Sequence, residues 1–227
     1  PEGDYDFTLT NCHEVEKTEV SVEKIWDDNN DQDGKRPESI EVQLLADQEP
    51  CGDPVTLNED NDWTYTWDDI DKYKNGGTEI VYTVAELGEI DGYTVSAVAG
   101  DAANGYTITN IHEIEKTSVS GSKVWDDEND YDGLRPESIT VDLLANGKKV
   151  DSQTVIADVN GEWKWSFTDL DKYANGEEIN YSFIDNVDGY TATEGDISNN
   201  YTLTNTHKPE KVDVEGSKTW KDSNDQD

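Results

Sequence analysis

The chain has 227 residues, of which 33% are apolar, and its 53 acidic and 17 basic residues give a formal net charge of -36. This acidity argues against nucleic-acid binding, because phosphate contacts need clustered Lys and Arg. No stretch of about 18 apolar residues is present that could cross a membrane. The composition alone resembles that of a disordered protein. However, seven Trp and eleven Tyr recur at fixed positions, which indicates folded domains with aromatic cores.

Two motifs recur along the chain and define its organisation. The first has Lys and Trp two residues apart and is centred on Lys24, Lys123 and Lys218. The second, Thr-x-Thr-Asn followed by x-His, has its Asn at Asn11, Asn110 and Asn205. Both motifs advance by 99 residues and then by 95, which identifies internal repeats.

The two motifs predict complete repeats at residues 18–112 and 117–207. Residues 1–13 are then the last strand of a preceding repeat, and residues 212–227 are the first strand of a following one. Because the pattern is already under way at Pro1, we expect a longer protein. The short, charged linkers at 112–116 and 207–211 favour an extended string of domains with limited bending.

Within each repeat, short segments with alternating apolar residues follow one another in the same order. After the Lys24 motif come an acidic loop at 27–34 and apolar segments at 40–45, 63–67, 79–86 and 106–110. The second repeat has their equivalents at 139–144, 163–167, 178–185 and 201–205. Six to eight short strands at this spacing, without helical periodicity, predict an all-β fold of tandem antiparallel β-sandwiches.

Alternation also places one Lys, one carboxyl and one Asn on inward faces of each repeat. These residues are Lys24, Glu86 and Asn110, and then Lys123, Asp185 and Asn205. They could satisfy one another by hydrogen bonds in the core. They could also react, because burial favours the neutral, nucleophilic amine and the neutral acid, and the Asn carbonyl is an electrophile. The product would be a Lys–Asn isopeptide bond, made with loss of ammonia and without a cofactor.

Four motifs in fixed order resemble a known family. They are the Lys-x-Trp-Asp-Asp opening, the Asp-Gly-x-Arg-Pro loop, the Tyr-Thr-Val-x-Glu strand and the closing Thr-Asn-x-His, and together they cover essentially the whole chain. They resemble the collagen-adhesin B-type (Cna B-type) repeats, which are immunoglobulin-like stalk modules of Gram-positive surface proteins.

The resemblance implies a role for each residue of the two polar sets. Lys24 would bond to Asn110 with Glu86 as the catalytic acid. Lys123 would bond to Asn205, with Asp185 at the catalytic position, where it is one methylene shorter than the expected Glu. Asn11 and Lys218 would take part in bonds of neighbouring repeats.

Two further features of the sequence suggest a metal site or a disulfide. Asn29, Asp31 and Asp33 resemble a calcium loop, but Ile40 occupies the twelfth position, where an EF-hand needs Glu. We therefore expect an acidic, solvated turn and no metal.

Cys12 and Cys51 could form a disulfide at the junction with a preceding repeat. Pairing between chains, an engineered pair and two free thiols are the alternatives.

The histidines and the aromatic strand have simpler interpretations. His13, His112 and His207 each follow the motif Asn by two residues, so we expect them to cap or pack at the junctions. Trp63, Tyr65 and Trp67 share one face, which predicts a place in the core, with a sugar-binding face as the alternative.

The sequence thus predicts a structural protein, namely a stalk or fibre module of an extracellular, wall-attached or fibre-forming surface protein. Self-formed isopeptide bonds would make it rigid and protease-resistant, with no cofactor. Its partners would be neighbouring repeats of the same chain and other copies in a fibre, with neither nucleic acid nor membrane. The alternative is an adhesin module that recognises a host protein or glycan. A turnover enzyme is not expected, because the reactive set consumes itself.

Overall fold

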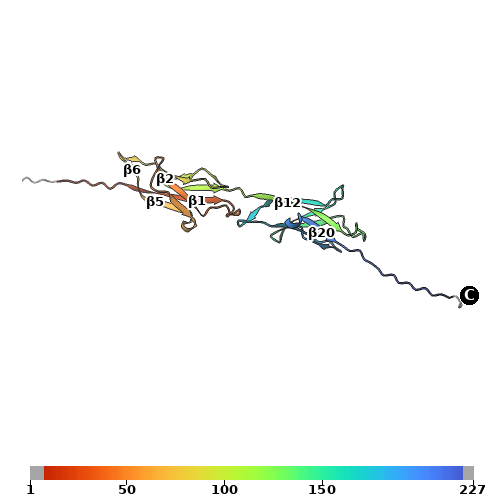
Figure 1. The fold of residues 1–227 in the computed structure, drawn as a ribbon. Coiled ribbons are helices and arrows are strands. Elements are labelled where there is room, and N and C mark those ends of the chain that lie inside the picture. The colour runs from red at the N-terminus through yellow and green to blue at the C-terminus, as the bar shows by residue number, and fades with distance from the viewer. Residues whose placement is uncertain (1–7, 222–227) are drawn as a thin grey trace, which may run out of the picture. The chain divides into compact units, whose positions relative to one another are not determined.

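The computed structural model describes residues 8–221, and these residues are almost entirely strands and loops. They form two compact units (Figure 1). One unit contains the residues before Lys116 together with 171–178, and the other contains the remainder. Residues 171–178, which the sequence pattern assigns to the second repeat, thus group with the first unit, and the predicted boundaries stay a prediction.

The first unit is a sandwich of two sheets. One sheet has the order β10-β11-β1-β5, with β9 also paired to β11. Its strands are β1 (Lys17–Asp27), β5 (Thr64–Asp71), β9 (Thr94–Val95), β10 (Ala99–Asp101) and β11 (Gly105–Ile111). In the facing sheet, β2 (Ser39–Ala46) pairs with β3 (Glu49–Pro50), β4 (Val55–Asn58) and β8 (Tyr82–Leu87). A 3-10 turn, η1 (Glu59–Asn61), and a hairpin of β6 (Tyr73–Lys74) and β7 (Thr78–Glu79) complete the first repeat.

The core of the first unit lies between these sheets, where alternating residues of both meet. Val20 and Val22 of β1 pack with Val42 and Leu44 of β2 and with Ile108 of β11. All five side chains are buried. The period of two in the sequence therefore correctly identified the inward faces of these strands.

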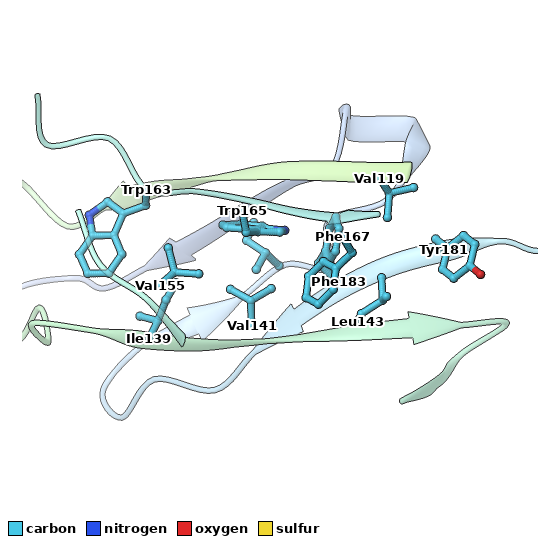
Figure 2. Close-up of a cluster of buried hydrophobic side chains, with 11 residues drawn as sticks. Val119, Ile139, Val141, Leu143, Val155, Trp163, Trp165, Phe167, Tyr181 and Phe183 are labelled. Atoms are coloured by element: carbon cyan, nitrogen blue, oxygen red, sulfur yellow. The ribbon is translucent and has the colours of Figure 1, made fainter. Parts of the chain in front are cut away.

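The second unit repeats this arrangement. Its first sheet has the order β15-β12-β20-β19, formed by β12 (Lys116–Asp126), β15 (Lys164–Asp171), β19 (Thr191–Ala192) and β20 (Thr202–Thr206). Its second sheet has β13 (Ile139–Ala145) between β14 (Lys148–Val155) and β18 (Tyr181–Asp185). The turn η2 (Ile197–Asn199) also lies in this unit, whereas the hairpin of β16 (Tyr173–Ala174) and β17 (Glu177–Glu178) belongs to residues 171–178, which group with the first unit. Figure 2 shows Phe167 and Phe183 together in this core. Their rings are stacked, with centroids 5.8 Å apart.

The predicted all-β sandwich class is confirmed, with one pairing that departs from an antiparallel arrangement. β1 runs parallel to β11, and β12 runs parallel to β20. Parallel neighbours need a long connection between them, and here the rest of the repeat supplies it. The first and last strands of each repeat are therefore hydrogen-bonded to each other and run in the same direction.

The aromatic strands of the two repeats pack differently. Trp165 of β15 is only 4% exposed, whereas Tyr65, its equivalent in β5, is 41% exposed, so the prediction that Tyr65 lies in the core is wrong. The reason lies on the neighbouring strand. Val22 fills the inward space beside β5, but Gly121 stands at that position in β12, and a Cβ atom there would be 2.7 Å from the Trp165 ring.

The segments outside the two sandwiches have no strand. Residues 8–16 and 207–221 contain no strand, and their backbone hydrogen bonds to the sandwiches include those of Glu16 with Lys72 and of His207 with Asp126. Asn11 and Lys218 are exposed there, and the rest of the predicted terminal strands, 1–7 and 222–227, lies outside the described residues. Their assignment to neighbouring repeats stays a prediction. Over residues 8–221, the structure contains no helix that is long and apolar enough to span a membrane.

Candidate functional site

One polar cluster lies in the core of the first repeat. Lys24 comes from β1 and Asn110 from β11, where Lys24 is in register with Ile108 and Trp26 with Asn110. The two side chains are therefore diagonal neighbours on the inward face. Glu86 comes from β8 of the facing sheet and completes what we call the first Lys–acid–Asn triad. Lys24 is 4% exposed and Asn110 is 0% exposed, so the triad is closed to solvent.

Glu86 bridges the other two members of this triad. Nδ2 of Asn110 donates a hydrogen bond to Oε1 of Glu86 at 2.8 Å, and Nζ of Lys24 lies 3.7 Å from Oε2. Nζ also donates to the backbone oxygen of Ile25 at 3.2 Å. Oδ1 of Asn110 and Oε2 of Glu86 are buried without a hydrogen-bond partner. Such unsatisfied buried acceptors are uncommon and need an explanation.

Lys24 lies against one ring of an aromatic cluster. Its Nζ lies 3.9 Å from the centroid of Trp26, and Trp26 makes edge contacts with Trp63 and Tyr93, each at 5.1 Å. Burial lowers the pKa of Lys24 to about 8, against the opposing attraction of the Glu86 charge. Lys24 is then the neutral amine in about a tenth of the molecules at pH 7, whereas an ordinary Lys is neutral in fewer than roughly one molecule in a thousand.

The second repeat has an equivalent triad of Lys123 from β12, Asn205 from β20 and Asp185 from β18. Nζ of Lys123 is hydrogen-bonded to Oδ2 of Asp185, and Nδ2 of Asn205 donates to the same oxygen at 3.3 Å. The shorter Asp thus reaches both partners, but with one oxygen where Glu86 uses two. Oδ1 of Asn205 again has no partner, and burial lowers the pKa of Lys123.

A second buried acid lies in the loop that sequence reasoning treated as a solvated turn. Asp28 is 1% exposed. It accepts two hydrogen bonds from the Arg36 guanidinium, at 2.7 and 3.0 Å, and one from the Tyr93 hydroxyl at 2.8 Å. Burial by itself raises the pKa of Asp28, but Arg36 outweighs it and the pKa falls to about 2. The expectation of solvation is therefore wrong for Asp28 and for Asp33, which is also buried, whereas Asn29 and Asn30 of the same loop are exposed.

Asp127, Arg135 and Tyr190 make the same contacts in the second repeat. The Asp-Gly-x-Arg-Pro motif contains the signal for this ion pair, because its Arg follows the buried Asp by eight residues in both repeats.

The remaining predicted positions are placed as follows. His112 and His207 lie directly after β11 and β20 and are hydrogen-bonded through both ring nitrogens. His13 is exposed. Cys12 is exposed and Cys51 is half-buried, and both are free thiols in the structure, so their disulfide stays a prediction.

Comparison with known proteins adds independent information. The family model for the Cna protein B-type domain matches residues 20–111 and 119–206. The chain is 44% identical over 221 residues to a collagen adhesin of Staphylococcus aureus, in an alignment that covers 97% of this chain and 18% of that protein. It is also similar to the crystal structure of two B repeat units of the collagen binding protein of Staphylococcus aureus. That match has a TM-score of 0.72 and 42% identity, and it covers 85% of this chain and 50% of the other.

Proposed function

Because the chain belongs to the family of Cna protein B-type domains, we propose that its repeats are stalk modules of a surface adhesin, each cross-linked by a self-formed Lys–Asn isopeptide bond. The observation that carries this proposal is the buried Lys–acid–Asn triad. It occurs at equivalent positions of the first strand, the last strand and the facing sheet in both repeats. The chain spans 18% of the length of its adhesin relative, so the module is proposed as part of a larger protein.

The chemistry follows from the positions of the atoms in the first triad. A proton passes from Nζ of Lys24 to Glu86, and the neutral amine attacks Cγ of Asn110. Glu86 then takes a second proton from Nζ as it delivers the first to Nδ2, the nitrogen to which it is already hydrogen-bonded. The Cγ–Nδ2 bond breaks, ammonia leaves with the delivered proton, and a Nζ–Cγ amide remains. The proton left on Glu86 departs with the ammonia as ammonium, so the carboxylate is restored.

The surroundings of Lys24 favour this reaction over hydrolysis. Trp26 covers the amine and is itself packed against Trp63 and Tyr93, and the Lys24 side chain is fully buried. A site without water keeps the Asn carbonyl available to the amine alone. The amine and the amide are both consumed in one event. The site is therefore proposed to act once for each molecule and not as a turnover enzyme.

The position of the bond explains a mechanical role. It would join β1 to β11, the parallel neighbours through which the chain enters and leaves the sandwich. Tension along the chain would then pass through covalent bonds and bypass the rest of the repeat. Closing a loop of this length also stabilises the fold by about 4–5 kcal/mol, if the entropy of disulfide loops is a fair guide. A rigid, protease-resistant spacer outside the cell follows from these two effects.

A binding module is the alternative function, and it requires an exposed aromatic patch common to both repeats. Among the described residues, Tyr65 is exposed but its equivalent Trp165 is buried. Tyr131 is exposed in the second repeat, where the first has Gln32. The exposed aromatic residues therefore differ between the repeats, and this supports the spacer over the binding module.

Intact-mass measurement tests the proposal. We expect the reduced chain to be lighter than its sequence by two ammonia molecules, and Lys24→Ala and Lys123→Ala each to remove one of these losses. Lys17→Ala is the matched control, because Lys17 pairs with Asp71 at the surface of the same strand, and it should keep both losses. A reduced mass equal to the sum of the sequence would reject the isopeptide mechanism.

A further inference from the structure

The segment that leaves each sandwich is attached to the acidic loop by a histidine. In the first repeat, Nδ1 of His112 lies 2.7 Å from the backbone oxygen of Gly92, and Nε2 lies 2.8 Å from Oδ2 of Asp33. The same Oδ2 accepts the backbone N–H of Glu115 at 2.7 Å. His112 and Asp33 are both buried. We call this set of four residues the first linker latch.

The proton count of this latch is fixed by its geometry. The oxygen of Gly92 can only accept, and Oδ2 of Asp33 faces a second donor, the N–H of Glu115. Beside an ionised Asp33, both ring nitrogens of His112 therefore donate. A neutral imidazole carries one N–H and an imidazolium carries two. With Asp33 ionised, the three hydrogen bonds form together when His112 is doubly protonated.

The second repeat has the same arrangement at equivalent positions. Nδ1 of His207 lies 2.8 Å from the oxygen of Gly189, and Nε2 lies 2.8 Å from Oδ2 of Asp132. The N–H of Glu210 again donates to this oxygen, at 3.1 Å. The recurrence of these three hydrogen bonds among four residues in a second sequence context argues against a chance contact.

The groups around each histidine favour its charged form. Asp33 and the charge of Glu115 act on His112, and the ring of Tyr93 lies 5.3 Å away. Burial lowers the pKa of His112, but the bonds to Gly92 and Asp33 outweigh it, so the pKa is raised.

His207 is less sheltered than His112. Asp132, Gly189 and the more distant charge of Asp127 raise its pKa, against a small opposing effect of burial. The ring of Tyr190 lies 5.5 Å away.

We propose that these two sites are proton-dependent latches that fix the start of each linker to the acidic loop of its own sandwich, and that deprotonation of the histidine opens them. Because the folded-state pKa is raised above the unfolded value, the stabilisation is complete at pH values below the unfolded pKa. It is lost as the pH rises through the folded-state pKa. In the first repeat, the neutral ring then leaves either the Gly92 carbonyl without a donor or the buried Asp33 carboxylate with the Glu115 N–H as its remaining donor.

The test is a pH titration of the whole chain by NMR. The ring nitrogens of His112 and His207 report protonation, and hydrogen exchange of the Glu115 amide reports whether the first latch is closed. The same chain unfolded in urea is the reference. We expect His112 and His207 to titrate at higher pH in the folded chain than in the unfolded chain. The protection factor of Glu115 should fall roughly tenfold or more across the His112 midpoint, since a buried hydrogen bond is lost.

Two variants separate the latch from general electrostatics. Asp33→Asn removes the carboxylate, and it should lower the His112 midpoint and abolish the pH step at Glu115 while His207 is unchanged. Glu23→Gln removes one exposed charge on β1 and should alter neither. The proposal is overturned if His112 titrates at the same pH in the folded and the urea-unfolded chain, or if protection of Glu115 does not depend on pH.

Discussion

Gly121 is the position where a single added carbon should lower the free energy of unfolding of the second sandwich. It occupies the inward site of β12 that Val22 holds in β1. An alanine Cβ there would lie 2.6 Å from the backbone oxygen of Tyr201 and 2.7 Å from two ring atoms of Trp165. Gly121 does not have a positive φ, so Gly121→Ala tests this steric conflict and not backbone strain.

The expected cost follows from these two contacts. Added carbon in a well-packed core typically costs about 1–3 kcal/mol. The upper part of that range applies here, because the backbone oxygen of Tyr201 cannot rotate away as a side chain could. The lower entropy of the unfolded alanine chain returns roughly 0.4–1 kcal/mol. We therefore expect Gly121→Ala to lower the free energy of unfolding of the second sandwich by about 2 kcal/mol.

Urea unfolding, followed by hydrogen exchange of the β20 amides, measures this loss in the second sandwich separately. Gly216→Ala is the matched control, because Gly216 stands in the third copy of the same motif and has open space around its Cβ position. The double variant Gly121→Ala, Trp165→Tyr should lose about 1 kcal/mol less unfolding free energy than the two single variants lose together, because the smaller ring frees space for the added carbon. Equal effects of the two glycine variants would refute the packing argument.

Two further predictions concern buried charges of the first repeat. Arg36→Met should destabilise the fold by about 3–5 kcal/mol in urea unfolding, because Asp28 is left buried without its ionic partner. Arg36→Lys should be less destabilising than Arg36→Met but still less stable than the unmodified chain, since an ammonium cannot make the two parallel hydrogen bonds of a guanidinium. In an Asn110→Ala variant, which cannot form the bond, Lys24 should titrate by NMR near its pKa of about 8. Adding Glu86→Gln should lower that pKa further, because the Glu86 charge raises it, and an ordinary Lys24 titration would contradict the burial argument.

Local periodicity in the sequence was sufficient to place the triads. A strand side chain points inward or outward according to its parity, so Lys24, Glu86 and Asn110 could each be assigned to an inward face from its own strand. Their mutual arrangement depends on strand pairing, which is not local. The parallel register of β1 and β11 makes Lys24 and Asn110 diagonal neighbours, and the facing sheet brings Glu86 between them.

The sequence by itself determined the repeats, the succession of strands along each repeat and the polar residues on inward faces, because spacing and alternation are properties of the chain alone. Only the tertiary structure decided how much room each inward residue has. Tyr65 turns to solvent beside Val22, whereas Trp165 fills the space beside Gly121. In the same way, Asp33 reads as a solvated loop acid until the fold places His112 against it. The exposure of Tyr65 and the pairing of Asp33 with His112 depend on segments that are distant in the chain, so neither could be predicted from local pattern.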